Sequence, residues 1–216
     1  MNNSHKSLAD IRKDYMLKTF DEQDVLADPF EQFKLWLHEA IQSEVNEANA
    51  MTLATASANG QPHARIVLLK GFDHDGAVFF TNYQSHKGQE LEQNPKVALT
   101  FFWAELERQV RIEGLATKVD PTHSDQYFYS RPKGSQIGAH ASPQSTVIVN
   151  RQHLEDRVKE FEELFAEQPL LRPEHWGGYV VKPVRFEFWQ GRSSRLHDRF
   201  LFEQKNGNWN KVRLAP

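Results

Sequence analysis

The spacing of apolar residues along the chain changes from a helical period to a period of two, and later back again. In residues 28–45 (DPFEQFKLWLHEAIQSEV), apolar positions recur every three or four residues, which predicts an amphipathic helix. Asp28 is suited to cap this helix, and Pro29 suits its first position. The predicted buried stripe consists of Phe30, Phe33, Leu37, Ile41 and Val45.

From Met51 onwards the pattern alternates with a period of two, which predicts strands. The β-branched and aromatic runs are MTLATAS (51–57), HARIVLLK (63–70), AVFFTN (77–82), KVALTFFWA (96–104) and RQVRIEGLATKV (108–119). The turn signals between them include ANGQ, where Asn and Gly tolerate positive φ, and DHDG. Five consecutive strands with short turns favour an antiparallel sheet that closes into a barrel.

Helical and strand patterns alternate in the rest of the chain. Helices are predicted at 86–95, 121–132 and 150–168, and strands at 179–191, 199–204 and 209–214, with KNGN as a hairpin turn. The face of the third helix carries Leu154, Val158, Phe161 and Phe165. No repeat or linker divides the chain. We therefore expect a polar, mobile arm over residues 1–27 and a single α+β domain over residues 28–216.

The composition narrows the class of protein. The chain has 216 residues, with 26 Lys and Arg against 29 Asp and Glu, so its net charge of −3 provides no general attraction to nucleic acid. Any bound anion must be held by a local cluster of cations. The absence of cysteine excludes disulfides and thiolate ligands. No apolar run approaches the roughly 20 residues of a membrane helix, and no signal peptide is recognisable. A cytoplasmic protein is expected.

Several short motifs that mark known binding or catalytic sites are incomplete or absent in this sequence. GFDHDGAV has the glycine spacing of a phosphate-binding loop but lacks its Lys-Ser/Thr pair, and GSQIG lacks the spacing of a nucleophile elbow. No GxGxxG is present. The ten histidines show neither HxH nor HExxH spacing, so the sequence predicts no metal site.

Cations gather where predicted strands and helices end. Arg65 and Lys70 flank an apolar run, and because they are five residues apart, strict alternation would place them on opposite faces. TNYQSHKG brings Thr81, Ser85, His86 and Lys87 to a helix start, where free N–H groups and the helix dipole favour an anion. The alternatives are solvated strand-end charges and an ordinary capped surface helix.

A second cluster lies in YFYSRPKGSQIG. Tyr127 and Arg131 are four residues apart and share a helix face, and a glycine-containing turn after Pro132 is expected to bring Ser135 close. Phenol, guanidinium and hydroxyl together would clamp a dianion such as phosphate. The alternative is a polar helix end. The following SPQSTV adds the neutral donors Gln144 and Ser145, which alone indicate only a loop.

The stretch EFWQGRSSRLHDR (187–199) is the richest in cations. If the chain after Gly191 is extended, the side chains of Arg195, His197 and Arg199 point to one face and Leu196 anchors the other. Three neighbouring cations repel one another unless a polyanion or an electron-rich ring lies among them. Trp189 would pack beside such a ring. The alternative is a solvated, arginine-rich loop.

With this stretch the sequence resembles a known family. E-F-W-Q-x4-R-L-H-D-R is similar to the C-terminal signature of the pyridoxamine 5′-phosphate (pyridoxine 5′-phosphate) oxidases. RIVLLK, FFTNYQSHK, LERQV, YFYSRPKGSQIGA, QS, WGGY and RLAP occur in that family's order, from about Ile11 to Pro216. The resemblance implies an FMN-binding split β-barrel that works as a homodimer, with two FMN sites at the subunit interface.

The resemblance also implies roles for individual residues. Arg65 and Lys87 should hold the FMN phosphate, assisted by Gln144 and Ser145. His86 stands where the family usually has arginine, so weaker and pH-sensitive FMN retention is expected. The other expected cofactor contacts are Ile66, Val67, Leu68, Leu69, Lys70, Phe80, Thr81, Gln109, Trp189 and Arg199. The expected substrate contacts are Arg12, Tyr15, Lys70, Tyr127, Arg131, Ser135, Arg195 and His197, of which Arg195 and His197 would stand over the pyridine ring as catalytic residues.

The implied reaction is the oxidation of pyridoxamine or pyridoxine 5′-phosphate to pyridoxal 5′-phosphate. The flavin N5 would take a hydride equivalent from C4′ of the substrate, and oxygen would reoxidise the flavin to give hydrogen peroxide, with ammonia released from the amine. A base role for His197 is left open. So are a flavin-barrel reductase with another substrate and a non-catalytic carrier of flavin or pyridoxal phosphate. The net charge speaks against a single-strand nucleic-acid binder.

Overall fold

The chain folds into two compact units, each of which is assembled from separate stretches of sequence. The computed structural model describes residues 7–11 and 13–216. One unit, here the terminal unit, comprises Met1–Ala48, Phe101–Arg111 and Arg185–Pro216. The other, the central unit, comprises Asn49–Thr100 and Ile112–Val184. The strands β5, β6 and β7 contribute residues to both.

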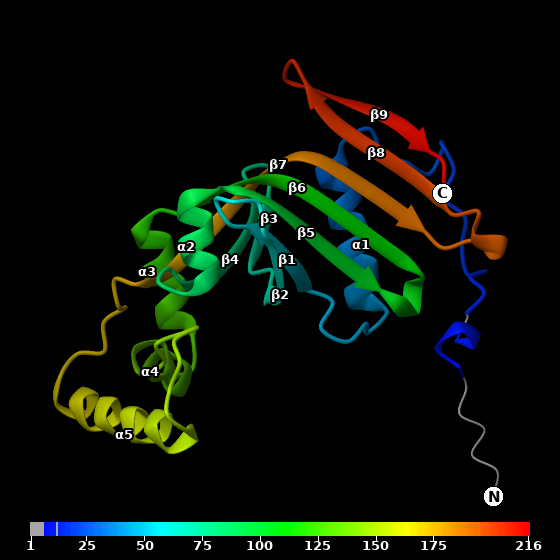
Figure 1. Cartoon of the computed structure of the whole chain (residues 1–216). Helices are drawn as coiled ribbons and strands as arrows, with labels where there is room; N and C mark the ends of the chain where they lie inside the picture. Colours follow the sequence, from blue (N-terminus) through cyan, green and yellow to red (C-terminus); the bar gives the residue numbers. More distant parts are fainter. Residues whose placement is uncertain (1–6, 12) are drawn as a thin grey trace, which may run out of the picture. The chain divides into compact units, whose positions relative to one another are not determined.

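The predicted α+β class and antiparallel sheet are confirmed (Figure 1). The helices are α1 (Pro29–Gln42), α2 (His86–Gln93), α3 (Pro121–Ser130), α4 (Lys133–Ala141) and α5 (Arg151–Glu167). The strands are β1 (Ala50–Ala56), β2 (Pro62–Leu68), β3 (Gly71–Asp73), β4 (Gly76–Asn82), β5 (Lys96–Trp103), β6 (Arg108–Lys118), β7 (Trp176–Gln190), β8 (Asp198–Lys205) and β9 (Asn208–Leu214). Their hydrogen-bonded order is β2-β1-β5-β6-β7-β4-β3, and β8 pairs with both β7 and β9.

Helix α1 forms where the apolar period predicts it, but its buried stripe is displaced. Asp28 caps the helix by accepting a hydrogen bond from the Phe30 N–H at 2.8 Å. Phe33 is followed on the buried face by Trp36 and Ala40, whereas Ile41 is 54% exposed. The prediction was therefore wrong for Ile41, while Leu37 is half-buried and Phe30, Phe33 and Val45 are buried as predicted. Within the terminal unit, Trp36 packs on the rings of Phe20 and Phe188.

The hairpin turns follow the predicted turn chemistry. Gly60 in ANGQ has φ +86°, and the β3–β4 turn closes on Gly76 with φ +133°. In the β8–β9 hairpin both Asn206 and Gly207 have positive φ, which matches the right-handed twist of the paired strands. The three-residue strand β3 is not predicted by the sequence pattern, because it is too short to show a period.

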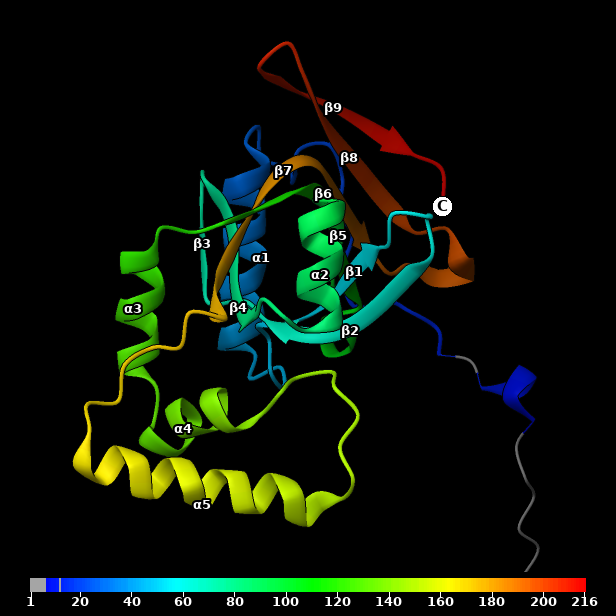
Figure 2. The same ribbon diagram turned by 60° about the vertical axis from the view of Figure 1, so that its left-hand side comes forward.

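Helix α4 is the other element that the sequence analysis misses. It occupies the segment after Pro132 in which a glycine-containing turn was expected, and Gly134 and Gly138 lower the helix propensity of that stretch. Helix α5 lies alongside α4 (Figure 2), and the rings of Phe161 and Phe165 contact His140 of α4 at 5.5 and 4.7 Å. The predicted apolar face of α5 is thus half-buried rather than part of a deep core.

Among the residues that the structure describes, none of the helices combines the length and the apolar character that a membrane crossing requires.

Gly76 provides a test of this fold. A Cβ atom at this position would lie 2.1 Å from the Val181 carbonyl oxygen, and φ +133° is strained for any L-side chain. We expect Gly76→Ala to lower the free energy of unfolding by about 2–4 kcal/mol, measured by urea denaturation. The matched control is Gly134→Ala in α4, where a Cβ meets nothing within 4 Å and helix propensity rises. Equal effects of the two substitutions would contradict the predicted clash.

Candidate cofactor and substrate site

A cavity of about 810 Å³ in the central unit contains most of the predicted site residues. Residues of β2, β4, α2, α3, α4 and the loop after α4 line it. The predicted residues among them are Arg65, Ile66, Val67, Leu68, Lys70, Phe80, Thr81, His86, Lys87, Tyr127, Arg131, Ser135, Gln144 and Ser145. The volume lies in the range of ordinary ligand pockets.

Arg65 and Lys70 both line this cavity, so the prediction that they face opposite sides of a strand was wrong. Strand β2 ends at Leu68, and the Lys70 N–H donates to the Val78 carbonyl at 2.8 Å as the chain turns towards β3. Strict alternation no longer applies across that break. Leu69, by contrast, is only 6% exposed and lies outside the cavity lining.

Lys87 forms a buried positive charge at one end of the cavity. Its ammonium donates to Gln144 Oε1 at 3.0 Å, to Thr81 Oγ1 at 3.1 Å and to Ser85 Oγ at 3.4 Å. Burial lowers the pKa of Lys87 to about 8, and the charge of Arg65 acts in the same direction. All three acceptors are neutral, so an anion in the cavity would provide the countercharge that Lys87 lacks.

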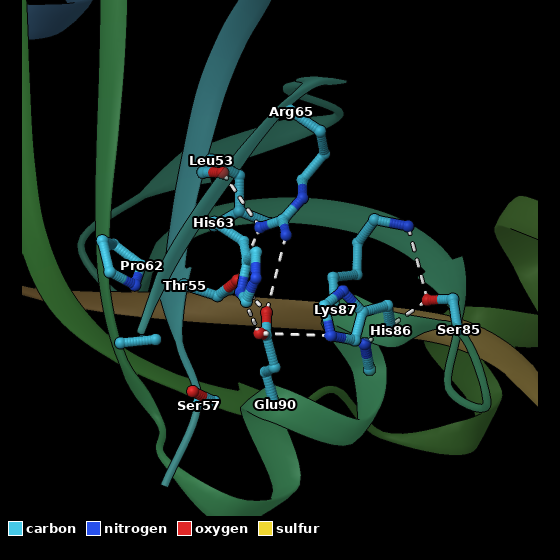
Figure 3. Close-up of polar contacts among 12 residues, drawn as sticks. Leu53, Thr55, Ser57, Pro62, His63, Arg65, Ser85, His86, Lys87 and Glu90 are labelled. Atoms are coloured by element: carbon cyan, nitrogen blue, oxygen red, sulfur yellow. Dashed lines mark hydrogen bonds and ion pairs between the residues drawn. The ribbon is translucent and has the colours of Figure 1, made fainter. Parts of the chain in front are cut away.

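Residues of strand β1 and helix α2 hold the Arg65 side chain in position (Figure 3). Its Nη1 donates to the Leu53 carbonyl at 3.1 Å and to Thr55 Oγ1 at 2.6 Å, while Nη2 lies 3.5 Å from Glu90 Oε2. Burial lowers the pKa of Arg65, although Glu90 opposes that shift. These contacts fix the guanidinium before any ligand arrives, which reduces the entropy lost on binding.

Glu90 is the buried partner in this group. Desolvation acts to raise its pKa, but the Thr55 hydrogen bond and the neighbouring His63 and His86 rings outweigh it, and the net pKa lies below the ordinary value. The Glu90 carboxylate is therefore ionised at neutral pH. Ser85 caps α2 by accepting a hydrogen bond from the Gly88 N–H at 3.3 Å. Ser85 and Glu90 together hold the N-terminal part of α2 next to the cavity.

An aromatic stack forms another part of the cavity wall. The rings of Phe80 and Tyr127 are stacked with centroids 4.0 Å apart, and Trp176 is stacked on Phe80 at 5.5 Å. The Arg131 guanidinium lies 4.6 Å from the Trp176 ring centroid, and Lys70 Nζ lies 6.0 Å from that of Tyr127. Arg131 Nη1 is buried without a hydrogen-bond partner, and burial lowers the pKa of this side chain. Such an unsatisfied donor indicates a place for an anionic ligand.

The remaining predicted residues of the cavity lie at its exposed rim. Ser135 is in the first turn of α4. Gln144 and Ser145 are exposed in the loop after α4, and Ser145 has φ +70°, which is uncommon for a residue other than glycine.

The predicted residues of the terminal unit form a separate aromatic group. The Trp189 and His197 rings lie 4.5 Å apart, and Tyr15 meets them edge-on at 5.7 and 5.9 Å. The Arg192 N–H donates to His197 Nδ1 at 3.1 Å, so Nδ1 is the acceptor and Nε2 carries the proton. Burial, helped by the charge of Arg195, lowers the pKa of His197. The ring is therefore neutral at pH 7.

The structure corrects the expected geometry of the arginine-rich stretch. Ser193–Arg195 form a short turn in which Ser194 and Arg195 have left-handed φ of +56° and +61°, so this segment is not an extended chain. Leu196 is 69% exposed and does not anchor the opposite face. Arg199 donates to Glu187 Oε1 at 2.8–3.0 Å and to the Ala215 carbonyl at 2.8 Å, so the protein itself neutralises this cation.

Two other residues that were predicted to contact a ligand are not part of the groups described above. Gln109 is partly exposed on β6, and Arg12 lies outside the described residues. Sequence reasoning missed Trp176, His63 and Glu90 as neighbours of the site. The spacing of Glu90, four residues after His86, places the two on one face of a helix and was an available signal. No local sequence pattern links His63 or Trp176 to His86 and Glu90.

Two family profiles match the chain. A profile described as pyridoxamine 5′-phosphate oxidase matches residues 37–165, and one described as the pyridoxine 5′-phosphate oxidase C-terminal dimerisation region matches residues 176–216. A pyridoxine/pyridoxamine 5′-phosphate oxidase from Trichormus variabilis is 54% identical over 212 residues, which is 98% of this chain and 99% of that protein.

Solved structures have the same fold. PhzG from Burkholderia lata 383, in complex with tetrahydrophenazine-1-carboxylic acid, matches 94% of this chain and 100% of its own with a TM-score of 0.87 and 29% identity. A pyridoxamine 5′-phosphate oxidase-related, FMN-binding protein from Nostoc punctiforme PCC 73102 matches 89% of this chain and all of its own, with a TM-score of 0.69 and 18% identity. The predicted split-barrel fold is confirmed.

The pKa of Lys87 leads to a testable pH dependence. Because this pKa is lowered to about 8, the cavity loses a positive charge as the pH rises through 8, and anion affinity should fall. We expect sulfate, whose charge is constant in this range, to bind the flavin-free protein roughly tenfold more weakly at pH 9.5 than at pH 6.5, measured by calorimetry.

The control for this prediction is Lys87→Arg, which keeps its charge over the whole range and should flatten the profile. A profile that is equally steep in Lys87→Arg would show that another group titrates.

Proposed function

The chain belongs to the pyridoxine/pyridoxamine 5′-phosphate oxidase family, and we propose that it oxidises pyridoxine or pyridoxamine 5′-phosphate to pyridoxal 5′-phosphate, with FMN as cofactor and oxygen as electron acceptor. The observation that carries this proposal is the cavity with two separate cationic groups. Arg65 and Lys87 form one, and Arg131 and Lys70 form the other. Two phosphorylated aromatic molecules need such a pair of anion sites.

The Arg65–Lys87 group fits the phosphate of FMN, on which the family depends. Lys87 has only neutral partners, Arg65 is held from behind, and the N-terminal N–H groups of α2 add the favourable end of a helix dipole. Thr81, Gln144 and Ser145 provide neutral polar groups beside it. When bound, FMN supplies the redox chemistry, accepting a hydride equivalent from the substrate carbon and passing the electrons to oxygen.

The Arg131 group fits the phosphate of the substrate. Arg131 Nη1 lacks a partner, and Tyr127, Ser135 and Lys70 line the same cavity. A dianionic phosphate would satisfy the guanidinium and be held by several charge-assisted hydrogen bonds. Fixing the phosphate fixes the position of the pyridine ring, which places the carbon to be oxidised for hydride transfer.

We assign a substrate-orienting role to Arg195 and His197, with Tyr15 and Trp189 as aromatic neighbours of His197. His197 has a lowered pKa and a proton on Nε2, so it is suited to donate a neutral hydrogen bond. The exposed Arg195 carries a positive charge that favours negative charge developing nearby during the reaction.

A homodimer with FMN sites at the subunit interface completes the proposal. Residues 176–216 match a profile described as a dimerisation region. Val147 and Val149, in the loop that carries Gln144 and Ser145, are 95% and 90% exposed, and Ile66 on the cavity wall is 64% exposed. Apolar side chains beside a binding site are what a second copy would cover. The cytoplasmic location stays a prediction.

Reduction of the flavin by substrate tests the proposed reaction. We expect the purified, FMN-loaded protein to absorb as an oxidised flavoprotein and to lose that colour when pyridoxine 5′-phosphate is added without oxygen. Admission of oxygen should restore the colour and release peroxide. Colour that persists after anaerobic addition of both substrates would leave flavin binding intact and refute the oxidase. Bleaching by a non-phosphorylated carboxylate instead would favour the alternative of another substrate.

The substrate role of Arg131 has a separate test. We expect Arg131→Gln to raise the KM for pyridoxine 5′-phosphate by roughly 10- to 100-fold while FMN content is unchanged, because the lost hydrogen bonds are charge-assisted. Activity with unphosphorylated pyridoxine should change far less. The control, Arg151→Gln, removes an exposed arginine of α5 and should change neither parameter. A parallel loss of FMN would contradict the assignment.

A further inference from the structure

Two histidines and a buried glutamate lie close together next to Arg65 and Lys87 (Figure 3). His63 comes from β2, and His86 and Glu90 come from successive turns of α2. The His63 and His86 ring centroids are 4.6 Å apart. One ligand atom from each side chain (a ring nitrogen of each histidine and a Glu90 carboxylate oxygen) lies within 4.8 Å of the other two. We refer to these three residues as the His63–His86–Glu90 group.

The geometry differs from that of an ordinary hydrogen-bonded cluster. His63 Nδ1 lies 2.5 Å from Glu90 Oε1, and His86 Nε2 lies 3.6 Å from the same oxygen. Yet both His63 Nδ1 and Glu90 Oε1 are buried without a partner in hydrogen-bond geometry. Glu90 is only 3% exposed, and its other oxygen is occupied by Thr55 and Arg65. The Glu90 carboxylate oxygen is thus buried between two imidazoles, close enough to both for one cation to contact all three groups.

Two imidazole nitrogens and one carboxylate oxygen are a ligand set that zinc uses in proteins. Metal–ligand bonds of about 2.0–2.2 Å at tetrahedral angles place the ligand atoms roughly 3.3 Å apart. The His86 nitrogen is already close to that separation from Glu90, and the His63 nitrogen needs to move away by less than about 1 Å. His86 is exposed and free to adjust, and it leaves solvent access for a water as fourth ligand.

We propose that His63, His86 and Glu90 bind a divalent transition-metal ion of the zinc type, at the edge of the cavity that His86 lines and next to Arg65. The sequence predicts no such site, because His63 and His86 are 23 residues apart and are brought together only by the pairing of β2 with β1, against which α2 packs.

The ion and a bound phosphate should favour each other. In the flavin-free protein Arg65 and Lys87 repel a cation, and Glu90 holds Arg65 through a contact of 3.5 Å. A phosphate dianion offsets both positive charges, and a metal ion on Glu90 neutralises the carboxylate that competes with phosphate for Arg65. Because coupling between two sites is reciprocal, FMN should tighten metal binding by the same factor as the metal tightens FMN binding. This second part rests on the proposed function.

Titration with Co²⁺ and Zn²⁺ tests the site itself without flavin. The chelator-treated, flavin-free protein should bind one Co²⁺ per chain with the visible absorption of a low-symmetry, four-coordinate ion, and Zn²⁺ should displace it. His63→Gln and His86→Gln should each weaken Zn²⁺ binding by about tenfold or more. His86 is exposed, so its variant tests the site without endangering the fold. The matched control is His153→Gln, the same substitution at an exposed position of α5.

Three results would overturn the site or its coupling. No saturable binding of one equivalent, or binding that is equally strong in His63→Gln, His86→Gln and the control, would refute the metal site. Repeating the Zn²⁺ titration with FMN bound should show at least about fivefold tighter binding, and an unchanged affinity would refute the coupling. If flavin fluorescence shows that FMN does not bind at all, the proposed function fails, and the flavin-free titration still decides the metal site.

Discussion

The contact between the buried carboxylate of Glu90 and the guanidinium of Arg65 is the interaction on which the cofactor end of the cavity depends. Glu90 lies on α2, Arg65 on β2, and Thr55 of β1 bonds to both. An ionised carboxylate in this position is costly unless it is paired, so the pairing holds the helix against the two strands. The same contact aims Arg65 and places the N-terminus of α2, with Lys87, at the cavity.

Two cations of the cavity, Lys87 and Arg131, have neutral neighbours, whereas several cations outside it are paired with carboxylates. Arg199 is bound by Glu187, and Asp198 accepts from Arg192 and Arg213, each at 2.8 Å. Lys87, in contrast, is buried with neutral partners, and the half-buried Arg131 has a buried nitrogen without a hydrogen-bond partner. Burial without a countercharge is unfavourable, and a phosphorylated ligand relieves it. A net charge of −3 is therefore no obstacle to the two anion sites that we propose.

Aromatic side chains lie beside several of these cations and provide flat apolar surface. The stack of Phe80, Tyr127 and Trp176 provides flat apolar surface beside Arg131, and Tyr15, Trp189 and His197 form a second aromatic group in the terminal unit. In the function that we propose, the stack beside Arg131 would hold a planar ring that is anchored through its phosphate, which leaves the ring few degrees of freedom.

The sequence by itself determined most elements of the fold and 14 of the 19 residues that line the cavity, because apolar periods, turn residues and family motifs are local signals. It placed Asp28 as a helix cap and Asn206–Gly207 as a hairpin turn correctly, since those roles depend on the residue and its neighbours. Only the tertiary structure decided that Trp36 and Ala40 are buried while Ile41 is exposed, that Lys70 shares a cavity with Arg65, that Glu187 neutralises Arg199, and that His63 meets His86 and Glu90. Each of these depends on which side chains distant in sequence come into contact, and periodicity within one segment carries no information about the element that will pack against it.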